Sequence, residues 1–237
     1  MYHAQRLAGP LTAIALALPG AVLAQDNLVV VELYTAQGCS SCPPADALLE
    51  EMAKNAEILA LAFHVDYWDY LGWQDAFASP AHTLRQKAYA HAAGERMIYT
   101  PQAIVDGTAR LVGSDAQALM SAVMQAMNKD RRAHVAVSRT GGNLTVTVTG
   151  TGSQPLQAAI EVLLVRYTPE ASVEILHGEN AGQTIRYVNT VTSVTHIGQW
   201  SGAEALSLTA PISGAEAAAI LVQAPDMGAV LAAALVP

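Results

Sequence analysis

The sequence has few charged residues, and basic residues are the scarcer kind. Lys and Arg together number 12 in 237 residues against 20 Asp and Glu, so the formal net charge is -8. No cluster of basic residues occurs beyond Arg131-Arg132. Because nucleic acids and anionic membrane surfaces are bound by clustered Lys and Arg, this scarcity argues against both as partners. An acidic balance bears mainly on solubility.

Long hydrophobic runs are absent after the first 24 residues. Residues 7–22 are apolar and small, are broken by Pro10 and Pro19, and lead to the small-x-small triplet Val22-Leu23-Ala24. This pattern is typical of a secretory signal peptide, residues 1–24. A membrane anchor is the alternative, but the run is short for a span of about 20 residues and contains prolines. We therefore expect an exported protein with no membrane span after cleavage.

Cysteine is also scarce, because the chain contains only Cys39 and Cys42. In an exported protein such a pair is normally oxidised to a disulfide. With two intervening residues, this disulfide closes a very small loop and constrains the unfolded chain little. That favours a redox role over the alternative, which is a purely structural bridge.

The two cysteines lie between a predicted strand and a predicted helix. Residues 28–34 are nearly all apolar and rich in Val, as in a strand buried on both faces. Residues 45–53 have helical periodicity, with an apolar side and an acidic side. The apolar side holds Leu48, Leu49 and Met52, and the opposite side holds Asp46, Glu50 and Glu51. A strand, a C-x-x-C turn and a helix form the context of a redox motif. In such a motif one thiolate attacks a substrate disulfide and the second resolves the mixed disulfide.

Strands and helices continue to alternate as far as residue 129. Residues 58–65 predict a second buried strand, parallel to the first. Residues 80–93 predict a helix that Ser79 caps and Gly94 ends. Strands at 103–105 and 109–112 flank an Asp-Gly hairpin turn, and residues 114–128 predict a last helix. The predicted apolar stripes of these two helices are Leu84, Ala88 and His91, and then Leu119, Met120, Val123, Met124 and Met127. The order is β-α-β-α-β-β-α.

From His134 onward, short strands alternate with turns. Residues 145–149 alternate strictly between Thr and Val. The predicted strands cover residues 134–139, 143–149, 156–167, 173–176, 184–193, 206–209 and 217–222. Such a series predicts a small, mainly-β, sandwich-like domain. We expect an α/β domain over residues 25–130 and this second domain over residues 131–237.

Residues 64–77 combine six aromatic or histidine residues, although the whole chain is only 5% aromatic. They follow the second strand at its carboxyl end, which is the edge where open α/β sheets bind ligands. The cysteine turn leaves the same edge, so we expect the two loops to be neighbours. Tyr67, Trp68, Tyr70 and Trp73 have two interpretations, a peptide-binding wall or a small core under the loop. Asp66, Asp69 and Asp75 are either acid/base groups or caps of the loop.

His64 has three interpretations. It is a histidine buried at a strand end, a general base beside the thiols, or a ligand of a metal site with Cys39 and Cys42. Two thiolates and an imidazole suit copper(I) or zinc. Otherwise the chain needs no cofactor beyond a redox-active Cys39–Cys42 disulfide.

The first half resembles the thioredoxin-like superfamily in its element order, in Cys39-Ser40-Ser41-Cys42 and in Thr100-Pro101 before the third strand. The resemblance implies a cis peptide bond at Pro101 facing the cysteine pair, with Thr100 offering backbone groups to a substrate chain. A trans proline opening an edge strand is the alternative. The resemblance further implies that Cys39 is the exposed nucleophile and Cys42 the buried resolving thiol.

More narrowly, the chain is similar to a family of secreted thioredoxin-like proteins of unknown function. The similarity rests on residues 32–46, residues 64–73, and Gly178-Glu179-Asn180-Ala181-Gly182 together with Trp200. It implies a bacterial periplasmic or secreted protein. One departure from thioredoxin is Pro43-Pro44 after Cys42. Because a residue before proline avoids the α region, Cys42 is expected to be the N-cap of the helix.

These patterns predict an exported thiol–disulfide oxidoreductase that acts on protein disulfides. Its partners would be protein thiols and disulfides and an unknown electron donor or acceptor. A protein that binds copper or zinc through the same cysteines is one alternative, and a non-catalytic interaction module is another. The glycines at 178 and 182 form a turn and match no phosphate-binding loop.

Overall fold

The computed structural model describes residues 28–152, 156 and 159–237. The predicted signal peptide, residues 1–24, lies outside the described residues. Within them, no helix is both long enough and apolar enough to cross a membrane. The first part of the described chain contains β1 (Val29–Thr35), α1 (Pro43–Met52), β2 (Ile58–His64), the 3-10 helix η1 (Asp69–Leu71), α2 (Pro80–Ala92), β3 (Gln102–Val105), β4 (Ala109–Val112) and α3 (Ala116–Met127). The second part contains β5 (Ala133–Thr140), β6 (Asn143–Gly150), β7 (Ile160–Glu174), β8 (Thr184–Trp200), β9 (Leu206–Pro211), β10 (Ala217–Gln223) and β11 (Val230–Leu235).

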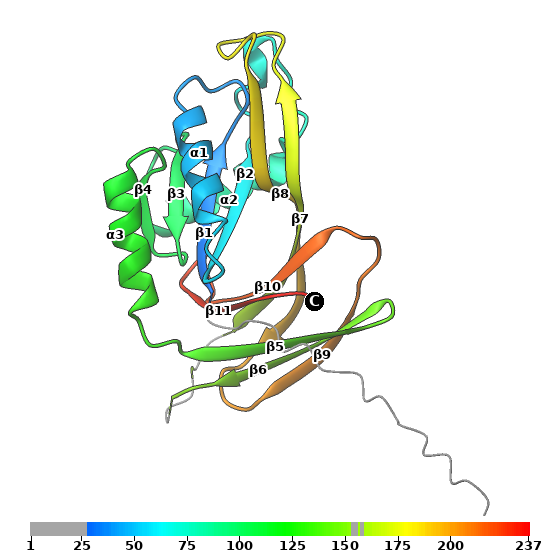
Figure 1. Ribbon diagram of the computed structural model, residues 1–237. Coiled ribbons are helices and arrows are strands. Elements are labelled where there is room, and N and C mark those ends of the chain that lie inside the picture. Colours follow the sequence, from blue (N-terminus) through cyan, green and yellow to red (C-terminus); the bar gives the residue numbers. More distant parts are fainter. Residues whose placement is uncertain (1–27, 153–155, 157–158) are drawn as a thin grey trace, which may run out of the picture.

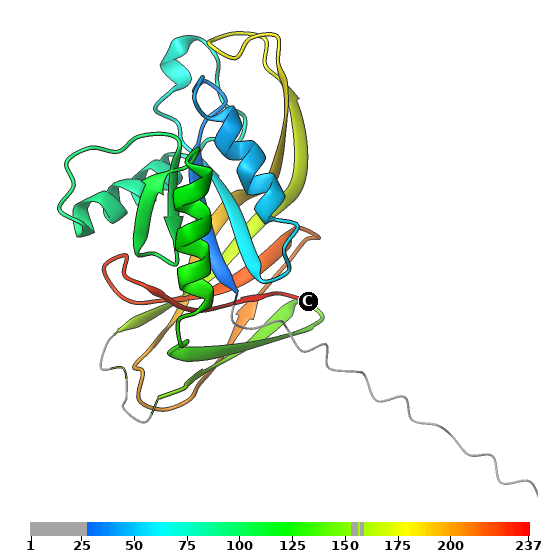
Figure 2. The same cartoon turned by 60° about the vertical axis from the view of Figure 1, so that its left-hand side comes forward.

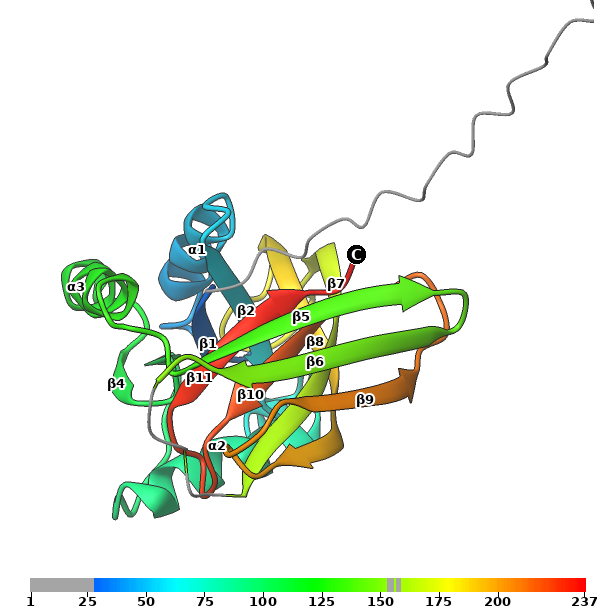
Figure 3. The same cartoon turned by 90° about the horizontal axis from the view of Figure 1, so that it is seen from below.

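The elements before residue 130 follow the order that the sequence predicts. β1 and β2 are parallel, with Thr35 beside His64 at their carboxyl ends. β3 and β4 form a hairpin through Asp106 and Gly107, whose φ angles are 45° and 70°. α1 and α3 cover one face of this part of the sheet and α2 covers the other (Figures 1 and 3). The cysteine turn therefore lies at the carboxyl edge of β1, beside the loop that follows β2.

Eight strands form one mixed sheet in the order β11-β10-β7-β8-β2-β1-β3-β4, and β5-β6-β9 form a small antiparallel sheet. The large sheet continues across residue 130, because β8 pairs in parallel with β2 at Thr190 and Ala62. The small sheet packs on β7, β10 and β11 through a shared core that includes Val135, Val146 and Ile220 (Figure 3). The chain is thus a mixed α/β protein in which the predicted sandwich-like part supplies four strands to the large sheet.

Two long strands explain this continuity. β7 has 15 residues and β8 has 17, and they pair with each other over nearly their whole length. The sequence predicted separate strands at 156–167 and 173–176. That prediction is wrong: the segment is one strand whose outer half is partly exposed on both faces. β11 was not predicted, because its alanine-rich sequence shows no period-2 alternation.

Two helices bury a different face from the one that the sequence predicts. On α2, Leu84 is 65% exposed, whereas the buried residues are His82, Thr83, Gln86, Tyr89 and Ala90. On α3, Leu119 and Val123 are buried as expected, but Met120, Met124 and Met127 are exposed. The sheet face beneath α2 carries hydrogen-bonding groups, so α2 buries its polar side chains there.

A buried ion pair joins α2 to the sheet. The Arg85 guanidinium donates from Nε and Nη2 to the two carboxylate oxygens of Glu32, each at 2.8 Å. The hydroxyls of Tyr34 and Tyr89 donate to the same carboxylate. Burial raises the pKa of Glu32, but Arg85 and these hydrogen bonds outweigh it and hold that pKa below its usual value. Gln223 of β10 accepts from Arg85 at 3.0 Å, which ties the two halves of the large sheet together.

Candidate functional site

The cysteine turn connects β1 to α1. Cys39 and Cys42 form a disulfide with their Cα atoms 5.4 Å apart. Cys42 is the N-cap of α1 and Pro43 begins the helix, as predicted. The conformational reason was wrong, since Cys42 has φ -80° and ψ -37°, within the α region. The Cys42 carbonyl accepts the backbone N–H groups of Ala45 and Asp46 at 2.8 and 3.1 Å, so the pair lies at the positive end of the helix dipole.

Both cysteines are fully buried, with 0% exposure. The exposed Cys39 that the resemblance implied is therefore absent from this oxidised structure. The turn between β7 and β8, residues 175–183, contacts the backbone of the cysteine turn and lies at the top of the molecule beside the N-terminal end of α1 (Figure 1). The Asn180 side-chain amide donates to the backbone carbonyls of Gln37 and Cys39, each at 2.9 Å. Residues 178–182 are among the stretches that carry the family similarity, and the sequence predicted a turn there. Their contact with the cysteine turn was not predicted, because nothing in the sequence pairs them with residues more than 130 positions away.

The aromatic segment lies beside the cysteine turn, as predicted. The Trp73 indole donates to the Gln37 side chain at 2.7 Å. Trp68 and Tyr67 are half-buried and pack on the core cluster that contains both cysteines. Tyr70 points away and is 79% exposed. The segment thus acts as packing around the turn, while Trp68 and Tyr67 also present part of their surface.

Thr100 and Pro101 join the same region. The peptide bond between them is cis, as the resemblance implied. The Trp68 indole donates to the Thr100 hydroxyl at 2.7 Å. The Tyr67 hydroxyl donates to Gln86 at 3.2 Å, and burial raises the pKa of Tyr67 to about 12. The four predicted substrate-binding residues therefore share one side of the site.

His64 lies at the end of β2 and is fully buried. Its Nδ1 is 2.7 Å from an Asp75 carboxylate oxygen, and the same oxygen accepts the Gln37 backbone N–H at 2.8 Å. Burial raises the pKa of Asp75, but the hydrogen bond and charge of His64 outweigh it and keep that pKa low. Phe77 and Tyr187 pack edge-on against the imidazole. Asp75 thus holds the ring in place. Asp66, by contrast, accepts the Thr83 hydroxyl, and Asp69 accepts the Asp75 backbone N–H.

Asp46 is the residue that sequence reasoning misplaced. The helical pattern put it on the acidic, solvent-facing side of α1, but it is only 5% exposed. Burial raises its pKa to about 7, an effect that the nearby His64 opposes. The Thr35 hydroxyl lies beside the carboxyl but outside hydrogen-bond geometry. The position follows Cys42 by four residues, so both side chains lie on one face of the helix. That spacing was the available signal.

Several buried polar atoms around Asp46 and His64 have no hydrogen-bond partner within the described residues. They are Thr35 Oγ1, Gln37 Nε2, both carboxylate oxygens of Asp46, His64 Nε2 and the Tyr187 hydroxyl. Buried polar groups are hydrogen-bonded in most folded proteins, and a redox or catalytic role is one explanation for those that are not. Six of the eight such atoms among the described residues belong to this group.

The predicted alternative of a metal site has no preformed ligand set. Within residues 28–152, 156 and 159–237, no group of three His, Cys, Asp or Glu side chains is arranged to hold a metal ion. The sulfurs of Cys39 and Cys42 are bonded to each other, and Nδ1 of His64 faces Asp75.

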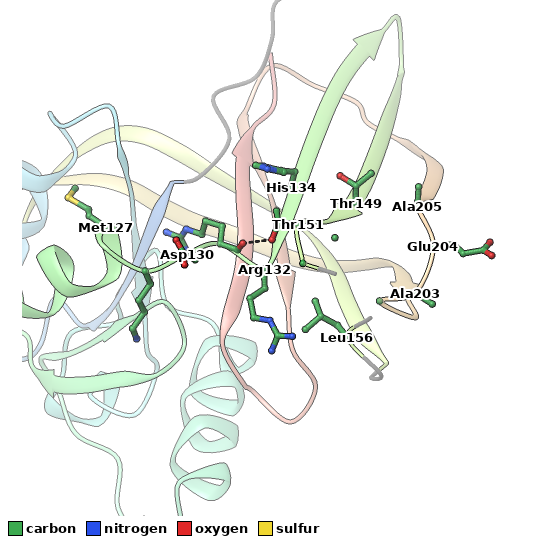
Figure 4. Close-up of a pocket in the computed structure, with 15 residues that line it drawn as sticks. Met127, Asp130, Arg132, His134, Thr149, Thr151, Leu156, Ala203, Glu204 and Ala205 are labelled. Carbon is green, nitrogen blue, oxygen red and sulfur yellow. Dashed lines mark hydrogen bonds between the residues drawn. The ribbon is translucent and has the colours of Figure 1, made fainter. Parts of the chain in front are cut away.

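A hollow of about 1260 Å³ lies far along the chain from this site, between the segment after α3 and the small sheet (Figure 4). Arg132, His134, Thr151 and Leu156 are among its lining residues. It contains none of the site residues that the sequence predicts.

The comparisons with known proteins identify the family. A family model described as "Protein of unknown function (DUF1223)" matches residues 30–223, so the chain belongs to this family. The chain is similar to protein AGR_C_4864 from Agrobacterium tumefaciens, with 29% identity, a TM-score of 0.74, and 88% of this chain and 93% of that chain covered. HBP35 of Porphyromonas gingivalis has a similar fold, with 15% identity, a TM-score of 0.63, and coverage of 88% and 74%. No curated protein matches.

Proposed function

We propose that this member of a family of unknown function is an exported thiol–disulfide oxidoreductase that acts on protein disulfides through Cys39 and Cys42. One observation carries the proposal: the disulfide lies at the N-terminus of α1, with the buried carboxyl of Asp46 one helical turn beyond Cys42. The β-α-β-α-β-β-α order of the elements before residue 130, the cis peptide bond before Pro101 and the signal-peptide pattern of residues 1–24 support it.

The reaction begins from the reduced pair. The Cys39 thiolate, stabilised by the helix N-terminus, attacks one sulfur of a substrate disulfide. The substrate S–S bond breaks, a mixed disulfide forms, and the released substrate thiolate takes up a proton. The Cys42 thiol then loses its proton and attacks Cys39, which frees the second substrate thiol and leaves the Cys39–Cys42 disulfide. A dithiol reductant outside the cytoplasm must return two electrons and two protons to restore the pair.

Asp46 is the proton acceptor for Cys42 in this scheme. A group moves protons best when its pKa is near the working pH, and burial raises the pKa of Asp46 to about 7. His64, which is hydrogen-bonded to Asp75, lies close enough for its charge to oppose the rise in the pKa of Asp46.

The test separates the two chemical steps. Cys42→Ser is expected to attack a protein disulfide such as that of insulin and to remain trapped as a mixed disulfide, whereas Cys39→Ser is expected to form none. Asp46→Asn is expected to leave the first step unchanged and to slow the release of substrate by about 100-fold or more. Glu51→Gln is the matched control, because Glu51 is an exposed acid on the same helix. Equal release rates for Asp46→Asn and the parent protein would remove the acceptor role.

A static disulfide in a non-catalytic module is the second candidate, and the full burial of both cysteines favours it. The reduction potential of the pair separates the two functions. A value between about -120 and -270 mV is expected for a catalytic pair, whereas a value below about -300 mV belongs to a structural bridge. Binding of copper(I) by the reduced protein tests the soft-metal alternative.

A further inference from the structure

The turn between β7 and β8 is a compact structure of its own. The backbone N–H of Gly182 donates to the Ile175 carbonyl at 2.7 Å, and that of Ile175 donates to Gln183 at 2.9 Å. Gly178 and Gly182 have φ angles of 81° and 82°, which other residues adopt only with strain. The turn therefore presents Glu179 and Asn180 in a defined conformation at the end of two long strands.

These two side chains contact the backbone of the cysteine turn and form its cover. Asn180 is 2% exposed and donates both of its amide hydrogens, one to the Gln37 carbonyl and one to the Cys39 carbonyl. The Ser40 backbone N–H donates to the Glu179 carboxylate at 3.3 Å. The Glu179 carboxylate thus accepts a hydrogen bond from the N–H group next to Cys39. Positive charge at this place would stabilise a Cys39 thiolate.

The cover is attached to the large sheet some distance below the site. β8 meets β2 at Thr190, and beyond that point the hairpin continues toward the cysteine turn as a pair of strands (Figures 1 and 2). An ion pair between Arg186 and Glu50, a ring contact between Trp73 and His177, and the buried ring of Tyr187 against His64 and Phe77 hold its outer part. The two hydrogen bonds of Asn180, each at 2.9 Å, are the shortest hydrogen bonds between the cover and the cysteine turn.

We propose that residues 175–183 are a gate over the disulfide, with Asn180 as its latch. In the closed form both cysteines are fully buried, so the site has to open before a substrate sulfur reaches Cys39. The gate opens when an extended polypeptide segment replaces Asn180, because backbone N–H groups of the substrate satisfy the same two carbonyls. Small reagents without peptide N–H groups, such as dithiothreitol, lack such donors and meet the closed form. This inference rests on the proposed function and assigns it a preference for polypeptide substrates.

The latch is tested with a reductant that needs no enzyme activity. The rate at which tris(2-carboxyethyl)phosphine reduces the Cys39–Cys42 disulfide is measured on the oxidised mature protein. Asn180→Ala is expected to raise this rate by about 10- to 30-fold, the change that two lost hydrogen bonds produce. Asn180→Asp is expected to raise it further at pH 8, where a carboxylate faces two carbonyl oxygens, and less at pH 4, where the introduced carboxyl is protonated. Leu176→Ala is the control, because Leu176 lies in the same turn and is 58% exposed.

Equal reduction rates for the parent protein and the folded Asn180→Ala variant would overturn the gate. An equal rise in the reduction rate of Leu176→Ala would overturn it too. So would a rise in the rate of Asn180→Ala that is in proportion to the fall in its Tm, since a general loss of stability would then explain the effect. The proposed function fails separately, when neither form reduces a protein disulfide although Asn180→Ala accelerates phosphine reduction. If both forms reduce insulin equally well, and the phosphine reduces the disulfide of both forms at equal rates, the gate fails and the proposed function stands.

Discussion

Replacement of Asp46 by Asn removes a buried carboxyl whose pKa rises to about 7. In the folded protein Asp46 keeps its proton up to about pH 7, whereas in the unfolded chain it releases the proton near pH 3.8. Between these values the unfolded state binds fewer protons than the folded state, so stability falls as the pH rises. Asn cannot ionise, and it resembles the protonated carboxyl in shape. The variant is therefore expected to escape this loss.

The size of the effect follows from the two pKa values. A difference of one in pKa corresponds to about 1.4 kcal/mol. The rise from 3.8 to about 7 thus removes roughly 4 kcal/mol of folding free energy above pH 7, of which about 3 kcal/mol is lost between pH 5 and pH 8. Relative to the parent protein, Asp46→Asn is expected to gain about 3 kcal/mol over that interval.

Urea unfolding of the oxidised protein at pH 5, 6, 7 and 8 measures this difference. Other groups titrate equally in both proteins, so only the difference between the two curves is interpreted. Glu51→Gln serves again as the control and is expected to follow the parent curve, since Glu51 is exposed. A difference between Asp46→Asn and the parent that stays constant within about 0.5 kcal/mol would show that Asp46 is ionised throughout. The acceptor role of Asp46 would then lose its physical basis.

Three further predictions concern the frame around the site. Glu32→Gln leaves the Arg85 guanidinium buried without its partner and is expected to cost about 3–5 kcal/mol in urea unfolding. Leu119→Ala is expected to lower the free energy of unfolding by about 2–5 kcal/mol, whereas Met124→Ala on the exposed side of α3 lowers it by less than about 0.5 kcal/mol. Equal losses would show that α3 buries the face that carries the methionines. The lowered pKa of Asp75 contributes stability that is present above pH 3.8 and is lost as the pH falls through the folded value. The difference in urea-unfolding free energy between the parent protein and Asp75→Asn, followed by circular dichroism, is therefore expected to shrink as the pH falls below 3.8.

Local patterns predicted the elements that short-range physics controls. Ser79 accepts the Ala81 backbone N–H at the start of α2, and Asp115 accepts that of Ala118 at the start of α3. Asp106-Gly107 forms the expected hairpin turn with two positive φ angles. Each of these features depends on residues within a few positions of one another, so the sequence specifies it directly.

Helix faces were less predictable, because the neighbour decides which face is buried. On α2 the exposed Leu84 and the buried Gln86 reverse the usual pattern. Gln86 donates to the Tyr99 carbonyl and to Gln102, so its polar atoms are satisfied inside the protein. On α1 the carboxyl of Asp46 is buried beside His64, which the hydrophobic periodicity of the helix does not predict. Hydrophobic periodicity counts apolar residues and does not see polar partners on other elements.

The sequence by itself determined the cysteine pair, its place between a strand and a helix, and the aromatic loop beside it. These features follow from the order of neighbouring elements, since consecutive parallel strands bring their carboxyl ends to one edge. Only the tertiary structure decided that Asn180 covers the disulfide and that β7 and β8 extend the sheet of β1 and β2. Both depend on contacts between residues more than 100 positions apart. Such contacts form only when the whole sheet assembles, and no local pattern encodes them.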